Sequence, residues 1–267
     1  MPHKLTAQRS RPAVVAGSFY PGSAENLSRA ISGLLASARS SERAALSGII
    51  VPHAGYVYSG SVAARAFASM PVVKNRFHRC VIVGPSHFVP FIGIAAPSHA
   101  AFATPLGEMP VDTDAVKALV TAARVVIDDA PHERDHAIEV ELPFLQAIFG
   151  SLPIVPLLFG ITSARAVAAA IAEVWTDTTL LVVSSDLSHY EDWEAARSHD
   201  TRTAEAIEAI DEGAIGPADA CGHLAIRGAL INAKRRGLAI ERVDLRNSGD
   251  TAGDKQTVVG YGAWAIG

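Results

Sequence analysis

The sequence predicts a three-layer α/β fold with a mostly parallel central sheet and helices on both faces. Apolar runs of strand length alternate with segments whose apolar residues recur at helical spacing, and this alternation is typical of parallel sheets. Three of the runs lead within a few residues to a histidine: His53, His87 and His189. In open α/β sheets, ligands bind at the carboxyl ends of the strands. The three histidines are therefore expected to share one crevice.

In the first half of the chain, caps and turn residues bound most of the expected elements. Ser23 and Asp112 can each accept a hydrogen bond from the backbone of a following helix. Residues 102–108 have the composition of a loop or an irregular hairpin. The expected helices cover residues 24–38, 59–69 and 112–122, and the expected strands cover residues 49–51, 80–83, 92–96 and 125–127.

In the second half, residues 131–150 should enter a helix that ends at Gly150, with Pro143 as a kink or a boundary. The other expected helices cover residues 163–175, 193–210 and 217–235, and the expected strands cover residues 154–159, 179–184, 240–247 and 257–266. No internal repeat, low-complexity tract or linker divides the sequence. Residues 1–267 are therefore expected to form a single domain.

Composition and charge exclude several classes of protein. Of the 267 residues 49% are apolar, as in a soluble chain with a large buried core. The formal net charge is −4 with scattered Lys and Arg, so no basic surface for nucleic acid is expected. No signal peptide or membrane-spanning run is present, which favours a cytoplasmic protein. Two cysteines argue against a disulfide framework, and Cys80, inside a strand pattern, is expected to be buried and unpaired.

A bound metal ion explains the convergence of strand-exit histidines best. Neutral imidazoles are common ligands of iron, copper and zinc, and two of them with one anion leave positions open for a substrate. The spacing leaves four candidates for the anion: Asp186, Glu139, Glu141 and Cys221. Asp186 could instead orient a histidine, or cap the turn that follows its strand.

Residues 132–136 match H-E-x-x-H, the motif in which zinc peptidases place two histidines on one helix face. The match follows Pro131 at a helix entry, whereas that mechanism needs both histidines inside one continuous helix. A cluster of charge at a helix N-terminus is therefore the expected role. His136 and Glu139, three residues apart, could still reach the crevice and contact a substrate or support the ligands. Glycine-rich phosphate motifs and the serine-hydrolase elbow are absent.

Seven motifs occur in order between residues 14 and 266: AGSFYPG, VPHAGYVYSG, VIVGPSHF, HERDHAIEVELPFLQ, SSDLSHY, DACG and GDKQTVVGYGAWAI. Together they resemble the Memo family, whose bacterial and archaeal members are called AmmeMemoRadiSam system protein B. Two departures are small: Asp135 replaces the more usual glutamate, and Arg246-Asn247-Ser248 stands where an aromatic-containing segment is commoner.

The Memo family in turn resembles the class III extradiol dioxygenases, such as the protocatechuate 4,5-dioxygenase catalytic subunit. Those enzymes hold Fe(II) with two histidines and a glutamate, and use a further histidine as acid and base. By this resemblance, His53 and His87 would be metal ligands and Cys221 would take the place of the glutamate. His189 would be the catalytic acid/base residue.

A thiolate ligand favours iron, copper or zinc over magnesium or calcium. It is also oxidisable, so dioxygenase activity does not carry over automatically. We expect a mononuclear non-haem Fe(II) protein, with copper or zinc as alternative metals, that has redox or oxygen-dependent activity on a small molecule. The alternatives are a non-catalytic module that binds a peptide or anionic ligand in the same pocket, and a zinc hydrolase. The family name also implies partners of the AMMECR and radical SAM types.

Overall fold

A nine-stranded sheet forms the centre of the part of the chain that this computed structural model describes, residues 10–38, 45–70 and 76–267. The strand order is β10-β11-β1-β8-β2-β7-β3-β6, and β9 pairs with β11 beside this series. The strands are β1 (Gly48–Val51), β2 (Arg79–Pro85), β3 (Ile94–Ala96), β6 (Val126–Ile127), β7 (Ile154–Phe159), β8 (Thr179–Ser184), β9 (His189–Glu191), β10 (Ile240–Asn247) and β11 (Val258–Ile266). A separate hairpin consists of β4 (Ala101–Thr104) and β5 (Gly107–Pro110).

The four central strands β1, β8, β2 and β7 are parallel. They are buried almost throughout, because helices cover both faces of the sheet, and this is why they appear in the sequence as continuous apolar runs. Cys80 lies in β2, fully buried and unpaired as predicted. On the outer sides, β11 pairs antiparallel with β1 and β3 pairs antiparallel with β7. The sheet is therefore mixed, with a parallel centre.

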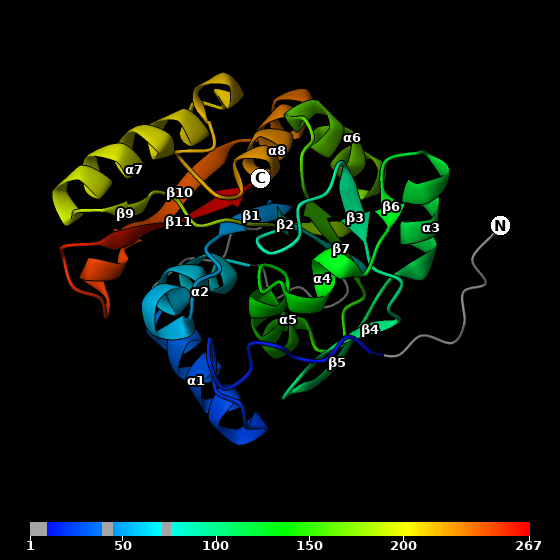
Figure 1. Ribbon diagram of the computed structural model, residues 1–267, viewed down its shortest axis with the longest axis horizontal. Coiled ribbons are helices and arrows are strands. Elements are labelled where there is room, and N and C mark those ends of the chain that lie inside the picture. Colours follow the sequence, from blue (N-terminus) through cyan, green and yellow to red (C-terminus); the bar gives the residue numbers. More distant parts are fainter. Residues whose placement is uncertain (1–9, 39–44, 71–75) are drawn as a thin grey trace.

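Helices lie on both sides of this sheet (Figure 1). One group packs together on one face: α1 (Ala24–Ser37), α2 (Ser61–Ala68) and α5 (Leu142–Phe149). The other face carries α3 (Thr113–Thr121), α6 (Ala164–Val174), α7 (Trp193–Glu208) and α8 (His223–Arg236). The predicted caps are present, since Ser23 and Asp112 accept from the backbones of α1 and α3. None of the helices in the described ranges is long and apolar enough to cross a membrane.

Residues 131–150, expected to lead from a loop into one helix, are divided into three short pieces. The pieces are a short α4 (Ala130–Arg134), a 3-10 turn (Glu139–Glu141) and α5, with Pro143 in the first turn of α5. Asp135 is extended between the pieces (ψ 142°), and its carboxylate accepts hydrogen bonds from the backbone N–H groups of His87 and Ala137. Pro143 is therefore a boundary rather than a kink.

Two other helices begin at different places from those expected. A π-helical turn, Tyr56–Gly60, precedes α2, so helical structure starts before residue 59. The helix expected from residue 217 begins only at His223, because residues 216–222 close a turn in which the Asp219 carboxylate accepts from Gly216 N–H at 2.7 Å. A Cβ at Gly222 would lie 2.4 Å from that of Ser185, so this turn packs directly on the exit of β8.

Candidate metal site

His53 and His87 converge at the carboxyl edge of the parallel strands. The strand β8 lies between β1 and β2, and all three run in the same direction. Each histidine follows its strand by two residues, so the two side chains leave the sheet at one edge. Their ring centroids are 5.0 Å apart and the rings are nearly perpendicular. These two of the three strand-exit histidines lie together at that edge, as the strand pattern predicts.

His136 completes a cluster with this pair. A ring nitrogen from each of His53, His87 and His136 lies within 4.8 Å of the other two, close enough for all three to hold one metal ion. His53 is buried, His136 is half-buried and His87 is exposed. The sequence indicates a supporting role for His136, whereas the structure places its ring nitrogens among those of the expected ligands. We call these three residues the histidine cluster.

The tautomer of His53 is set by a serine at the end of β8. His53 Nδ1 is 2.7 Å from Ser184 Oγ, and that hydroxyl is 2.7 Å from the carbonyl oxygen of Ala137. A carbonyl only accepts, so Ser184 donates its hydrogen to Ala137 and accepts one from His53 Nδ1. The lone pair of His53 therefore lies on Nε2, the nitrogen that faces the cluster.

Asp135 orients His87 in a comparable way. His87 Nδ1 lies 3.2 Å from Asp135 Oδ1, and the backbone N–H of His87 donates to Oδ2 at 2.6 Å. A carboxylate behind a histidine commonly fixes the ring of a metal ligand. Burial alone would raise the pKa of Asp135, but the hydrogen bonds from His87 and Ala137 outweigh it and lower the pKa to about 2. Asp135 is therefore ionised at neutral pH and holds the Nδ1 proton of His87.

Burial keeps two members of the cluster, His53 and His136, unprotonated. The pKa of His53 is lowered to about 3, first by burial and then by its neighbour His87. The pKa of His136 is lowered to about 4 by burial and by the two other histidines. Neutral imidazole is the form that binds metal ions, so these rings need not lose a proton before they can act as ligands.

Cys221 lies next to the cluster. Its Sγ is 3.3 Å from His53 Nε2 and 3.6 Å from the carbonyl oxygen of Asp186. Burial, together with the Asp186 carboxyl group, raises the pKa of the thiol to about 12. The side chain is accordingly a thiol when no cation is bound, and a positive ion beside it would favour the thiolate. The three imidazoles and the thiol thus come from four separate segments of the chain.

Comparison with known proteins identifies the family of this chain. A family model described as Memo-like protein covers residues 11–265. The chain belongs to this family. MEMO1 family proteins from Nitrosopumilus maritimus and Methanosarcina acetivorans are 34% and 33% identical to it, each over 271 residues. The alignments cover 95% of this chain and 98% and 97% of the two relatives, so the similarity extends over almost the whole length.

A solved structure has the same fold as this Memo-family chain. The crystal structure of uncharacterized protein JW3007 from Escherichia coli K12 matches with a TM-score of 0.52. The match covers 83% of this chain and all of the other, at 13% sequence identity. At that identity the likeness concerns the fold alone.

Two further residues expected at the site of the Memo-family chain lie around the cluster. Asp186 is buried and accepts a hydrogen bond from the backbone N–H of His53 at 2.9 Å. Burial raises its pKa, while that hydrogen bond acts in the opposite direction. His189 is exposed on β9, yet its charge lowers the pKa of both His53 and Asp186. It therefore lies within electrostatic reach of the cluster without belonging to it.

The two glutamates that the spacing offers as ligands lie behind the site. Both oxygens of Glu139 are engaged by the N-terminal segment: Tyr20 donates to Oε1 at 2.6 Å, and Arg11 forms a buried ion pair with Oε2. Glu141 is buried behind Ser184, 3.3 Å from its hydroxyl, and burial raises its pKa well above the ordinary value. The Glu139 carboxylate thus contacts the N-terminal segment and the Glu141 carboxyl group contacts Ser184, so both lie behind the cluster.

The H-E-x-x-H match does not form a peptidase site. The helix α4 ends at Arg134, so His132 and His136 do not share a helix face. His132 is buried with its Nε2 3.1 Å from the carbonyl oxygen of Ala95, and burial lowers its pKa to about 4. His132 is therefore a buried neutral residue, and the charged cluster expected at a helix N-terminus is not formed, because Asp135 follows the last residue of α4.

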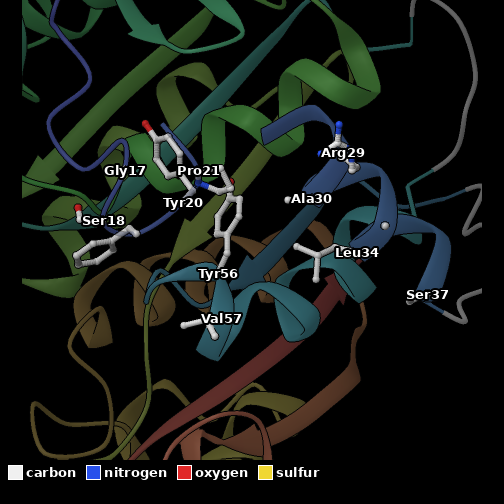
Figure 2. Close-up of a pocket in the computed structure, with 12 residues that line it drawn as sticks. Gly17, Ser18, Tyr20, Pro21, Arg29, Ala30, Leu34, Ser37, Tyr56 and Val57 are labelled. Atoms are coloured by element: carbon white, nitrogen blue, oxygen red, sulfur yellow. The ribbon is translucent and has the colours of Figure 1, made fainter. Parts of the chain in front are cut away.

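A surface pocket of about 670 Å³, whose lining residues are shown in Figure 2, lies next to His136 of the cluster. It is lined by the N-terminal segment around Tyr20, by α1 and by the π-helical turn at Tyr56, and no residue of the histidine cluster lines it. Phe19 lines this pocket, and its ring centroid is also 4.8 Å from that of His136. Phe19 therefore connects the pocket wall to the cluster.

Ser184 and Asp135 are the functional residues that sequence reasoning missed. Each acts by holding the Nδ1 of a histidine that is distant in sequence, over 131 residues for Ser184 and 48 for Asp135. The available signals were the Ser-Ser-Asp that follows a buried strand and the aspartate next to His136 in the HERDH segment. Neither signal identifies the histidine that it supports.

Proposed function

We propose that the histidine cluster and Cys221 hold one redox-active metal ion, Fe(II) first and copper next. The protein would use this ion in a redox or oxygen-dependent reaction on a small molecule. The observation that carries the proposal is the set of three imidazoles whose nitrogens lie within 4.8 Å of one another, beside a thiol 3.3 Å from one of them. The resemblance of the family to extradiol dioxygenases supports the same chemistry.

The donor set fits such an ion. The Nδ1 protons of His53 and His87 are held by Ser184 and Asp135, which leaves both Nε2 atoms free to bind a metal. Nitrogen and sulfur donors suit iron, copper and zinc and do not suit magnesium or calcium. When bound, the ion would supply electron transfer or the activation of oxygen.

The other residues would bind the substrate and handle protons. We assign His189 to proton transfer because it is exposed at the edge of the site and lies outside the cluster. An imidazole can both accept and release a proton near neutral pH, which is the requirement for general acid/base catalysis. Asp186, which accepts from the His53 backbone, would help to hold the strand exit in place.

Metal analysis tests the proposal. Protein purified without oxygen should contain stoichiometric metal, measured by inductively coupled plasma mass spectrometry. His53→Ala, His87→Ala and Cys221→Ser should each lose most of it, since each removes one proposed donor. His136→Ala decides the place of the third histidine: loss of metal makes it a ligand, and retention makes it a supporting residue.

Two variants serve as controls. His78→Ala removes an exposed histidine and should keep full metal content. His132→Ala should also keep it, and loss there would favour the zinc-hydrolase alternative. Unchanged metal content in the variants of His53, His87 and Cys221 would contradict the site.

Turnover is tested separately. Oxygen uptake by the iron-loaded wild type, measured with catechols and other small reductants, should disappear in His189→Ala while the metal content is kept. If the loaded wild type consumes no oxygen, a non-catalytic binding module becomes the better assignment.

A further inference from the structure

His199, in the middle of α7, lies between two carboxylates. Its Nδ1 is 2.9 Å from Glu191 Oε1 and its Nε2 is 2.8 Å from Asp219 Oδ1. An ionised carboxylate can only accept hydrogen bonds, so both ring nitrogens must donate and the ring is an imidazolium cation. The side chain is only 15% exposed, which strengthens both charge-assisted bonds.

The two carboxylates belong to the segments that carry two proposed site residues. Glu191 ends β9, two residues after His189. Asp219 precedes Cys221 by two residues, and its second oxygen closes the turn by accepting from Gly216 N–H. His199 therefore joins the strand of the proposed proton-transfer residue to the turn of the proposed thiolate ligand.

Helix α7 also contacts the backbone of the residue that precedes His189. Asp200, the next residue of α7, accepts from the backbone N–H of Ser188 at 3.0 Å. The strand β9 needs this support, because it pairs with β11 through only two residue pairs among the described residues, with an irregular register between them. Tyr190, in the middle of β9, has φ of +63°, a left-handed conformation that is costly for a residue with a side chain.

We propose that His199 is a positioning residue, whose cation ties Glu191 and Asp219 to α7 and so fixes His189 and Cys221 relative to each other. The chemical roles of His189 and Cys221 rest on the proposed function, whereas the link that His199 makes between Glu191 and Asp219 is a property of the fold. The contrasting possibility is an ion pair without positional effect, as many partly exposed pairs are. Thiol reactivity separates the two, because it reports the exposure of Cys221.

The experiment compares alkylation of the two cysteines in chelator-treated, metal-free full-length protein. Iodoacetamide labelling is followed by mass spectrometry of the peptides that contain Cys221 and Cys80. In His199→Gln an amide can donate to one carboxylate but presents its oxygen to the other, so the turn should loosen. Cys221 should then react on the order of tenfold faster, while fully buried Cys80 stays unreactive.

Two variants control for charge and chemistry. Glu205→Gln changes one exposed charge on the same helix and should react like the wild type. His199→Arg keeps a planar cation with donors on separate edges, and should restore the slow wild-type rate. A purely structural loss of the histidine ring would not be rescued in this way.

A wild-type rate at Cys221 in His199→Gln overturns the proposal. If Cys80 also becomes reactive, that variant has opened globally and Asp219→Asn decides: its amide oxygen can still accept from Gly216, but the attraction to His199 is lost. Faster labelling of Cys221 alone supports the tie, and an unchanged rate overturns it. Because no metal is present, a wild type that binds no metal would refute the proposed function and leave this result standing.

Discussion

At the scale of single residues, hydrogen-bond partners fix where protons lie on several groups near the site. Ser184 and Asp135 hold the Nδ1 protons of two cluster histidines, and His199 keeps both of its protons between two carboxylates. Asp200 differs from these groups, because its burial favours the protonated, uncharged carboxyl group. Its side chain is almost fully buried, and burial raises its pKa from 3.8 to about 6 even though hydrogen bonds from Ser188 lower it.

The raised pKa of Asp200 predicts a pH-dependent gain in stability for Asp200→Asn. In the folded state this carboxyl binds its proton more tightly than in the unfolded state, so its ionisation costs stability as the pH rises from about 4 to above 6. An amide removes that cost and still accepts from Ser188. Urea unfolding should show the variant more stable than the wild type at about pH 7.5, by at most about 3 kcal/mol, and no gain near pH 4.

The control for this prediction is Glu205→Gln, an exposed carboxyl on the same helix. It should change stability little at either pH, since surface groups away from special contacts contribute little. An equal gain at both pH values in Asp200→Asn would show that its effect is not one of ionisation.

The strand-exit histidines could be predicted from the sequence because a residue directly after a buried parallel strand lies at the edge of the sheet where ligands bind. The place of His136 beside them could not be predicted from the sequence. The sequence predicts that the chain enters a helix near this residue, and the break at Asp135 depends on hydrogen bonds to the exit of β2, far away in the sequence. The sequence places Cys221 in a helix for the same reason, since the Gly216–Asp219 turn and the contact of Gly222 with Ser185 are tertiary.

At the scale of elements, α6 and α8 pack closely enough to exclude a single methyl group. A Cβ on Gly228 would lie 2.9 Å from Val167 Cγ1 and 3.1 Å from the backbone N of Ala168. Asn232, one turn later in α8, donates to the carbonyl oxygen of Ala168 at 2.8 Å and fixes the same contact. Since α8 follows the Cys221 turn directly, this packing also anchors that side of the site.

Gly228→Ala should therefore destabilise the protein despite the better helix propensity of alanine. Propensity alone would favour alanine by about 1 kcal/mol, while overpacking typically costs about 1–3 kcal/mol. Gly33→Ala is the matched control, because it lies on the exposed side of α1 and a Cβ there meets nothing within 4 Å. Urea unfolding should show a net loss for the first variant and a small gain for the second, and a gain in both would contradict the close packing.

At the scale of the whole molecule, the N-terminal segment is held against the back of the site by a buried network. Glu139 accepts from Arg11, Tyr20 and the backbone N–H groups of Val14 and Val15. Arg11 also donates to the carbonyl oxygens of His132 and Asp135, the residues on either side of the α4 end. This network joins the first described residues to the segment that carries His136.

Glu139→Gln should be severely destabilising for this reason. The amide could still accept from Tyr20, but its NH₂ group would face the Arg11 guanidinium, donor against donor, and a buried cation would lose its counter-ion. Breaking a buried ion pair by removing one partner typically costs about 3–5 kcal/mol. The midpoint of urea unfolding should fall accordingly, and limited proteolysis should cut the N-terminal segment before the rest of the chain.

The control is Glu133→Gln, an exposed change in α4, which should change neither the unfolding midpoint nor the order of proteolysis. If Glu139→Gln instead unfolds like the wild type, the segment is held by its apolar contacts, such as that of Phe19 with His136, and the ion pair adds little.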